Sequence, residues 1–200
     1  MRRDLSDSEL VDRFKSGDKA AYAEIVRRYQ DRVYGLAYRW MADEQIAREV
    51  TQDAFVAIFK ALPRFRGESQ LSTWIFRVVV NHCKNRRQYR RRRRTGFHDP
   101  LEGRAASHED APRREFAGDG PLPDAGADAS DAKRLVDAAL NELDEEFRVV
   151  LVLRDIEDRS YEEIAELLGM AKGTVKSRLH RARAQLAKVL ARSVSAQDVL

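Results

Sequence analysis

The residues with the clearest chemical capability lie between Lys172 and Arg192, where seven lysines and arginines occur without an acidic residue. The preceding stretch, residues 132–171, carries five basic and eleven acidic side chains, so the positive charge is confined to one segment. Lysine and arginine neutralise phosphates, and arginine, serine and threonine also hydrogen-bond to the edges of bases. This pattern is typical of a nucleic-acid-binding helix.

A second cationic cluster holds seven arginines between positions 86 and 94. Such a cluster could bind phosphates, because the release of counterions from nucleic acid adds to the affinity. At the end of a helix it would also interact favourably with the helix dipole and with an acidic segment that follows. We expect both effects.

Two short helices must position the first cluster. Four apolar residues spaced as i, i+3, i+4 and i+7 from Tyr161 would line one face of a helix, and Ser160 with Glu163 has the spacing of a capping box. A turn containing Gly169 follows, and a second helix begins near Lys172. The segment 160–179 therefore predicts a helix-turn-helix.

The second helix has an apolar stripe and an opposite polar face. At about 100° per residue, the stripe consists of Val175, Leu179, Ala182, Leu186 and Leu190. We predict that the residues away from the stripe or on its flanks meet a DNA major groove: Lys172, Gly173, Thr174, Lys176, Ser177, His180 and Arg181. The alternative is an amphipathic surface helix whose basic residues are only solvated.

The N-terminal part of the sequence predicts four more helices. They cover about Asp7–Lys15, Ala20–Trp40, Asp43–Leu62 and Thr73–Arg94, and Pro63 ends the third. The third helix has two apolar stripes, one with Ile46, Val50, Ala54 and Ile58, the other with Phe55 and Phe59. We expect one stripe to pack in the core and the other to be a docking surface.

The charge divides the chain into three zones. Residues 1–94 have a net charge of +10, residues 95–131 have −6 and contain all the prolines but Pro63, and residues 132–200 are neutral. The middle zone has too little apolar content to offset the entropy of ordering. We predict an all-α fold with two small helical domains, 1–94 and 132–200, joined by a flexible acidic linker, 95–131.

Several classes of protein are disfavoured. The single cysteine, Cys83, excludes an intrachain disulfide and a cysteine-rich zinc site. Apolar runs such as Val149–Leu153 are far too short to span a membrane, so we expect a soluble cytoplasmic protein. A hydrolytic site made of Glu49, Asp53 and His82 lacks metal-ligand spacing, a nucleophile motif and a phosphate cradle. We predict no catalytic residue, no metal and no cofactor.

Several motifs in register resemble the extracytoplasmic-function sigma factors of the sigma-70 family, which are two-domain bacterial initiation factors. The motifs are Glu49 and Gln52 with Asp53–Phe55, Arg64–Ser69, Thr73–Arg77, Val80–Asn81, Ser160–Ala165 and Gly173–Leu179. The resemblance covers about residues 7–94 and 132–190. It implies a subunit that binds core RNA polymerase and promoter DNA without a small-molecule substrate, and that an anti-sigma factor commonly inhibits.

The resemblance also implies site residues. The helix-turn-helix would bind the −35 element as duplex, and the first domain would capture bases of the −10 element on the non-template strand. The matching −10 positions are Phe65, Arg66, Gly67, Glu68, Ser69, Arg77, Asn81, Lys84, Arg86 and Arg87. Core polymerase would contact Glu49, Gln52, Asp53 and Phe55.

Some interpretations stay open at this stage. Trp74 lies in an apolar stretch and fits a core position better than a wedge between bases. Phe65 could stack on a base or fill space beneath the loop. The sequence could also belong to a transcriptional regulator whose first domain senses a signal or dimerises. The polar loop and basic helix over 63–94 favour a factor that opens DNA, because a sensor domain needs neither.

Overall fold

The computed structural model describes residues 5–94 and 127–197. Within these ranges the chain forms helices and no strands, which confirms the predicted all-α fold. Most of the predicted linker, residues 95–126, lies outside the described residues, so its flexibility stays a prediction. Among the residues that the structure describes, none of the helices combines the length and the apolar character needed to span a bilayer.

The first module contains the four predicted helices. They are α1 (Asp7–Lys15), α2 (Lys19–Met41), α3 (Glu44–Ala61) and α4 (Leu71–Arg94), and a 3-10 turn, η1 (Leu62–Arg64), follows α3. Ser6 forms a capping box at α1, and the carboxylates of Asp18 and Asp43 accept from backbone N–H groups at the starts of α2 and α3. These caps satisfy N–H groups that have no partner inside the helix.

Apolar residues with helical spacing form the core of this module. The fully buried side chains include Ile25, Val33 and Leu36 of α2, Ile58 of α3, and Ile75 and Phe76 of α4. The periodicity of 3.6 residues brings each set to one side of its helix, so that burial follows directly from the sequence pattern.

The second module contains α5 (Ala127–Glu142), α6 (Glu145–Leu151), the π-helical turn η2 (Val152–Ile156), α7 (Tyr161–Leu168) and α8 (Lys172–Gln197). Its core includes Leu140, Val150, Leu153, Ile164, Val175 and Leu179. Helix α5 begins at Ala127, slightly before the start that we predicted for this module.

Helix α6 continues directly into η2. The helix widens at Val152, whose carbonyl accepts from the N–H of Glu157 at 3.0 Å, five residues ahead. The carbonyl of Leu153 instead accepts from the N–H of Arg159 at 2.9 Å, beyond the helix. A π-turn of this kind inserts one residue into an α-helix, and hydrophobic periodicity alone does not reveal it.

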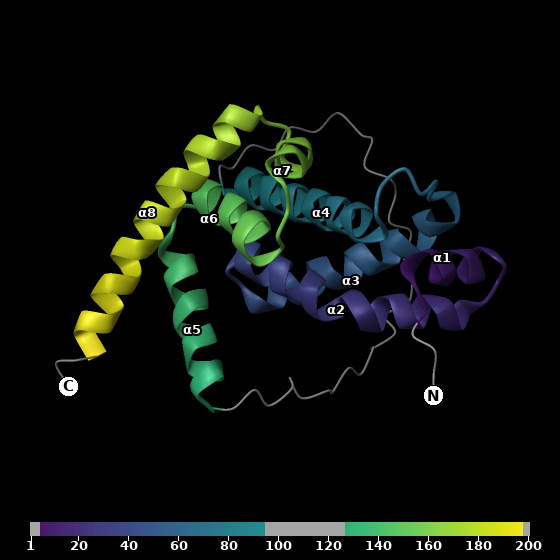
Figure 1. Cartoon of the computed structure of the whole chain (residues 1–200), viewed down its shortest axis with the longest axis horizontal. Coiled ribbons are helices and arrows are strands. Elements are labelled where there is room, and N and C mark those ends of the chain that lie inside the picture. Colours follow the sequence, from purple (N-terminus) through teal and green to yellow (C-terminus); the bar gives the residue numbers. More distant parts are fainter. Residues whose placement is uncertain (1–4, 95–126, 198–200) are drawn as a thin grey trace.

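The two modules pack against each other. Figure 1 shows α2, α3 and α4 side by side, with α6 and α7 against α2 and α4 and with α8 on the outside. The segment between η2 and α7 lies at this junction, where Arg32 of α2 forms an ion pair with Glu157 at 3.0 Å. The contact places the acidic start of α6 and the acidic helix α7 close to the cationic helix α4.

Candidate nucleic-acid interface

The helix-turn-helix has the predicted caps and turn. The hydroxyl of Ser160 accepts from the N–H of Glu163 at 3.1 Å, and the carboxylate of Glu163 accepts from the N–H of Ser160 at 2.9 Å. Gly169 ends α7 with φ at 69°, a left-handed conformation that glycine adopts without steric cost. The chain can therefore reverse its direction at Gly169 without backbone strain.

Helix α8 has the orientation that the sequence predicted. Val175, Leu179 and Ala182 are buried, and Leu186 and Leu190 are half-buried. Thr174 is half-buried, and the other predicted groove-facing residues are exposed: Lys172, Gly173, Lys176, Ser177, His180 and Arg181. The polar face of α8 that we predicted to contact DNA is thus accessible on the surface of the molecule.

The charges on α8 fall into two groups. Arg183 pairs with Asp155 at 2.6 Å and Arg178 with Glu146 at 2.7 Å, which ties these arginines to their own module. The side chains of Lys176 and Arg181, in contrast, form no hydrogen bond or ion pair with any residue within the described ranges. Their charge is available to a phosphate or base without the loss of an existing contact.

The loop before α4 combines a packed aromatic pair with an exposed turn. Phe65 and Trp74 are both half-buried, with ring centroids 5.2 Å apart, and the ammonium group of Lys15 donates to the Phe65 carbonyl at 2.7 Å. Arg66, Gly67 and Glu68 are exposed, and Ser69 is half-buried. Trp74 packs against the core as expected, and Phe65 uses part of its ring surface to cover Trp74.

Several predicted −10 residues of α4 contact the second module. The guanidinium of Arg77 pairs with Glu166 at 2.6 Å, the ammonium of Lys84 donates to the carbonyl of Leu167 at 2.7 Å, and Arg87 pairs with Glu145. Burial lowers the pKa of Lys84. Asn81, in contrast, is exposed, and Arg86 pairs with Glu49 of α3 within the first module.

A buried polar network holds the junction, and sequence reasoning missed it. Arg159 is 6% exposed and donates to the Thr73 hydroxyl at 2.9 Å, while its guanidinium carbon lies 4.6 Å from the centre of the Phe76 ring. Arg32 lies over the same ring at 5.1 Å. Glu157, also 6% exposed, accepts from Arg32. The only sequence signal for Glu157 and Arg159 was the presence of charged residues in the short segment before α7.

Glu163 joins the capping box to this network. Burial raises the pKa of its carboxyl, but hydrogen bonds from the backbone of Ser160 and the hydroxyl of Thr73 outweigh burial and leave the pKa below its usual value. The Thr73 hydroxyl donates at 2.9 Å. The carboxylate thus has donors from both modules.

The predicted polymerase-binding residues lie on α3. Gln52 and Asp53 are exposed, and Glu49 and Phe55 are half-buried. Of the two apolar stripes, the one with Val50, Ala54 and Ile58 is core. Phe59 is 42% exposed, and its ring packs edge-on against Phe14 and Tyr22 at 5.3 and 5.0 Å. Helices α1 and α2 therefore cover part of the second stripe.

Two of the reactive side chains considered from the sequence, Cys83 and Glu49, are buried or paired. Cys83 is buried, and burial raises the pKa of its thiol to about 12. Glu49 is engaged by Arg86. In the part of the chain that the structure describes, no group of three histidine, cysteine, aspartate or glutamate residues could hold a metal ion.

Comparison with known proteins identifies the family. The model of sigma-70 region 2 matches residues 25–95, and that of sigma-70 region 4 matches residues 133–186. The chain is 36% identical to an RNA polymerase sigma-H factor of Pseudomonas aeruginosa over 189 residues, which cover 92% of this chain and 93% of that protein. The chain belongs to the extracytoplasmic-function (ECF) sigma factors. An ECF sigma-E factor of Haemophilus influenzae is also 36% identical, over 92% of this chain and 94% of its own length.

Solved structures agree with the ECF sigma factor fold. The structure of CnrH in complex with the cytosolic domain of CnrY matches with a TM-score of 0.60 and 26% identity, over 92% of this chain and 96% of that one. The sigma factor RpoE of Bartonella quintana, solved with the anti-sigma factor NepR, shares the fold with a TM-score of 0.59 and 23% identity, over 84% of this chain and 96% of that one.

The family and function predictions are confirmed. This ECF sigma factor directs RNA polymerase in promoter recognition, strand opening and transcription initiation. The alternative of a regulator with a sensor domain has no support, because both modules match sigma regions.

Proposed function

We propose that the two modules divide promoter recognition between them. Helix α8 binds the −35 element in the major groove, and the loop 65–70 with α4 binds the −10 element after its strands separate. The chain contributes no catalytic residue, because polymerase performs the chemistry, and it acts in the cytoplasm. The observation that carries the proposal is the capped helix-turn-helix with Lys176 and Arg181 exposed on α8 and not engaged by other described residues.

The −35 contacts divide into two kinds. Lys176 and Arg181 supply charge for phosphates and for bases, and Ser177 and His180 supply polar groups at positions where the helix is exposed. Phosphate contacts position the protein on duplex DNA, whereas contacts to base edges select the sequence. Lys172, Gly173 and Thr174 lie at the start of α8, the end that enters the groove in helix-turn-helix proteins.

The −10 contacts suit single-stranded DNA. Asn81 is exposed and offers a donor and an acceptor to the edge of a base. The exposed part of the loop, Arg66–Glu68, lies in the sequence between Phe65 and Trp74, the aromatic pair on which an unstacked base could rest. The cations of α4, which include Arg77, Lys84, Arg86 and Arg87, would neutralise phosphates of the displaced strand.

Core polymerase and an anti-sigma factor are the proposed protein partners. The exposed carboxylate and amide of Asp53 and Gln52 lie beside the partly exposed apolar residues Val56 and Phe59 of α3. A mixed polar and apolar surface of this kind is common at protein interfaces. Support for an anti-sigma partner comes from the similarity to CnrH, which was solved in complex with the cytosolic domain of CnrY.

Run-off transcription with purified core polymerase tests the proposal. The chain is added to core enzyme with a library of promoter fragments, and the transcribed fragments are sequenced to find the shared −35 and −10 elements. We expect transcripts that depend on this chain and that share both elements. Transcripts that appear equally without the chain, or no binding to core polymerase, would contradict the proposed function.

A further inference from the structure

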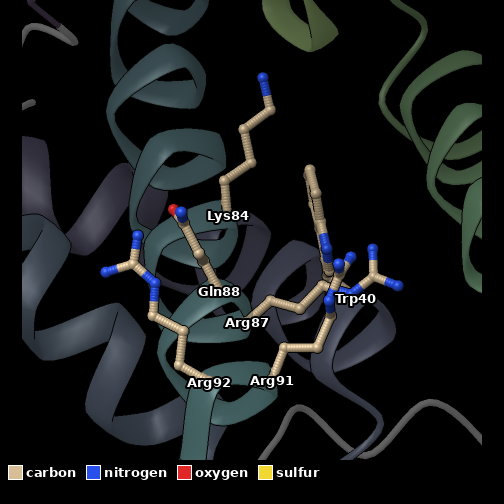
Figure 2. Close-up of a pocket in the computed structure, with 6 residues that line it drawn as sticks. All are labelled: Trp40, Lys84, Arg87, Gln88, Arg91 and Arg92. Atoms are coloured by element: carbon tan, nitrogen blue, oxygen red, sulfur yellow. The ribbon is translucent and has the colours of Figure 1, made fainter. Parts of the chain in front are cut away.

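A cationic pocket lies between the end of α2 and the last turns of α4 (Figure 2). It has a volume of about 430 Å³, within the range of small-ligand sites. Figure 2 shows Arg87 and Arg91 of α4 extending toward Trp40 of α2, whereas Arg92 extends away from it. Among the described residues, none of those that line it is acidic: they are Trp40, Lys84, Arg87, Gln88, Arg91 and Arg92. This composition is suited to an anion.

A carboxylate of the second module already contacts this pocket. Glu145, the first residue of α6, accepts from the indole N–H of Trp40 at 3.3 Å and pairs with the guanidinium of Arg87 through the same oxygen. The Glu145 side chain is 21% exposed, and that of Arg87 is 50% exposed. One carboxylate thus bridges donors from two helices of the first module.

The same face of α4 meets further oxygen acceptors. Thr73, Arg77, Lys84 and Arg87 lie within roughly 80° of the helix circumference and along about 20 Å of its length. Their partners in the second module are Glu163, Glu166, the carbonyl of Leu167 and Glu145. Three of these four partners are carboxylates, which form a row of anionic oxygen atoms along α4. The phosphates of a nucleic-acid strand would offer the same kind of acceptor to these donors.

We propose that the pocket between α2 and α4 binds a phosphate group of single-stranded promoter DNA, and that Glu145 competes with this phosphate while the two modules are packed together. The proposal rests on the proposed −10 function of α4. It extends that function to a defined pocket and to Trp40 and Gln88, which neither the sequence motifs nor the comparisons assign.

The pocket favours a nucleic-acid phosphate over an isolated small anion because of its position. Lys84 and Arg87 belong both to the pocket and to the proposed −10 face, and the arginines of α4 continue beyond it. A strand held at Asn81 could therefore pass directly into the pocket. Since DNA and Glu145 would use the same donors, binding of the strand and packing of the modules oppose each other.

Substitution Glu145→Gln in the full-length chain tests the competition. It removes the charge and keeps the shape, and the matched control is Glu146→Gln, which changes the next residue of the same helical turn but breaks a contact to Arg178 of its own module. Affinity is measured by fluorescence anisotropy with a labelled single-stranded −10 oligonucleotide. We expect Glu145→Gln to bind about fivefold more tightly, as for one half-exposed ion pair, and Glu146→Gln to bind like the parent.

A second variant tests the pocket itself. Arg91→Gln should weaken binding of the single strand and reduce the slope of log affinity against log salt by about one. Binding of a −35 duplex should not change, because α8 is far from the pocket in sequence and does not line it. An unchanged salt slope would overturn the assignment of the pocket as a phosphate site.

Two further outcomes would overturn the proposal. One is equal affinity of Glu145→Gln and Glu146→Gln for the single strand. The other is tight binding of a polyglutamate peptide to Glu145→Gln without any gain for DNA, which would identify an acidic protein segment as the ligand. If the parent supports run-off transcription, these results reject only the competition, whereas failure of the parent in run-off transcription rejects the proposed function.

Discussion

Substitution Arg159→Ala should separate the two modules. The guanidinium of Arg159 is buried at the junction, donates to Thr73 at 2.9 Å and lies 4.6 Å from the centre of the Phe76 ring. A desolvated cation–π contact contributes about 2 kcal/mol, and a hydrogen bond from a charged group contributes about 1.5–3 kcal/mol. Relief of the cost of burying the guanidinium offsets part of this loss.

We expect a net loss of about 2 kcal/mol from the packed arrangement, which corresponds to about a 30-fold fall in the ratio of packed to separated molecules. The loss should stay below the 3–5 kcal/mol that is typical when a buried charge loses its partner. The reason is that Glu163, which pairs with Arg159 at 3.3 Å, keeps its donors Ser160 and Thr73 when Arg159 is removed.

Single-molecule energy transfer measures the two populations. Dyes are attached to cysteines introduced at Lys60 and Lys188, which are exposed on α3 and α8. Cys83 should not compete for the label, because its thiol is buried and its pKa is raised to about 12. The control is Arg183→Ala, which removes an arginine that pairs with Asp155 inside the second module.

The two substitutions should change the low-transfer population differently. Arg159→Ala should show a larger low-transfer population, and Arg183→Ala should resemble the parent. Equal populations in the parent and Arg159→Ala would refute the claim that Arg159 holds the modules together. An equal effect of both substitutions would show that general destabilisation of the second module, and not the junction, caused the change.

Other expected outcomes concern the DNA contacts and the helix cap. Lys176→Ala or Arg181→Ala should reduce run-off transcription from promoters with a −35 element, and unchanged output from both would contradict the assignment of α8. Asn81→Ala should reduce permanganate reactivity of the −10 region more than it reduces binding of duplex DNA, and identical footprints would remove that role. Ser160→Ala should lower the free energy of unfolding by about 1 kcal/mol, measured by urea denaturation, because α7 loses its cap. Because the folded-state pKa of Glu163 is lowered, its contribution to stability is complete above the ordinary carboxyl pKa and should be lost as the pH falls from that value through the lowered one; the loss in urea midpoint over that range should be smaller in Glu163→Gln.

The helices and their buried faces could be predicted because local patterns determine them. The stripe from Val175 to Leu190 predicted which side of α8 is exposed, and Ser160 with Glu163 predicted where α7 begins. Each of these signals lies within a few turns of one helix. The bounds of α1 matched the prediction because Ser6 caps its start and Gly17, with φ at 97°, follows its end.

The junction could not be predicted because it joins residues far apart in the chain. Thr73 and Arg159 are 86 residues apart, and no periodicity links one to the other. For the same reason, sequence motifs indicated that Arg77, Lys84 and Arg87 bind DNA but did not reveal their partners in the second module. Phe65 packs against Trp74 with part of its ring and leaves the rest exposed. This arrangement likewise depends on packing.

The extra residue in the π-turn of η2 sets how the segment after it is oriented relative to α6. Removal of a residue from Val152–Ile156 would restore regular α-helix and would rotate everything downstream by about 100° relative to α6. Glu157 and Arg159 would then turn away from Arg32 and Phe76, although the helix-turn-helix itself could still fold. The presence of one extra residue in this segment would thus determine whether the two modules pack against each other.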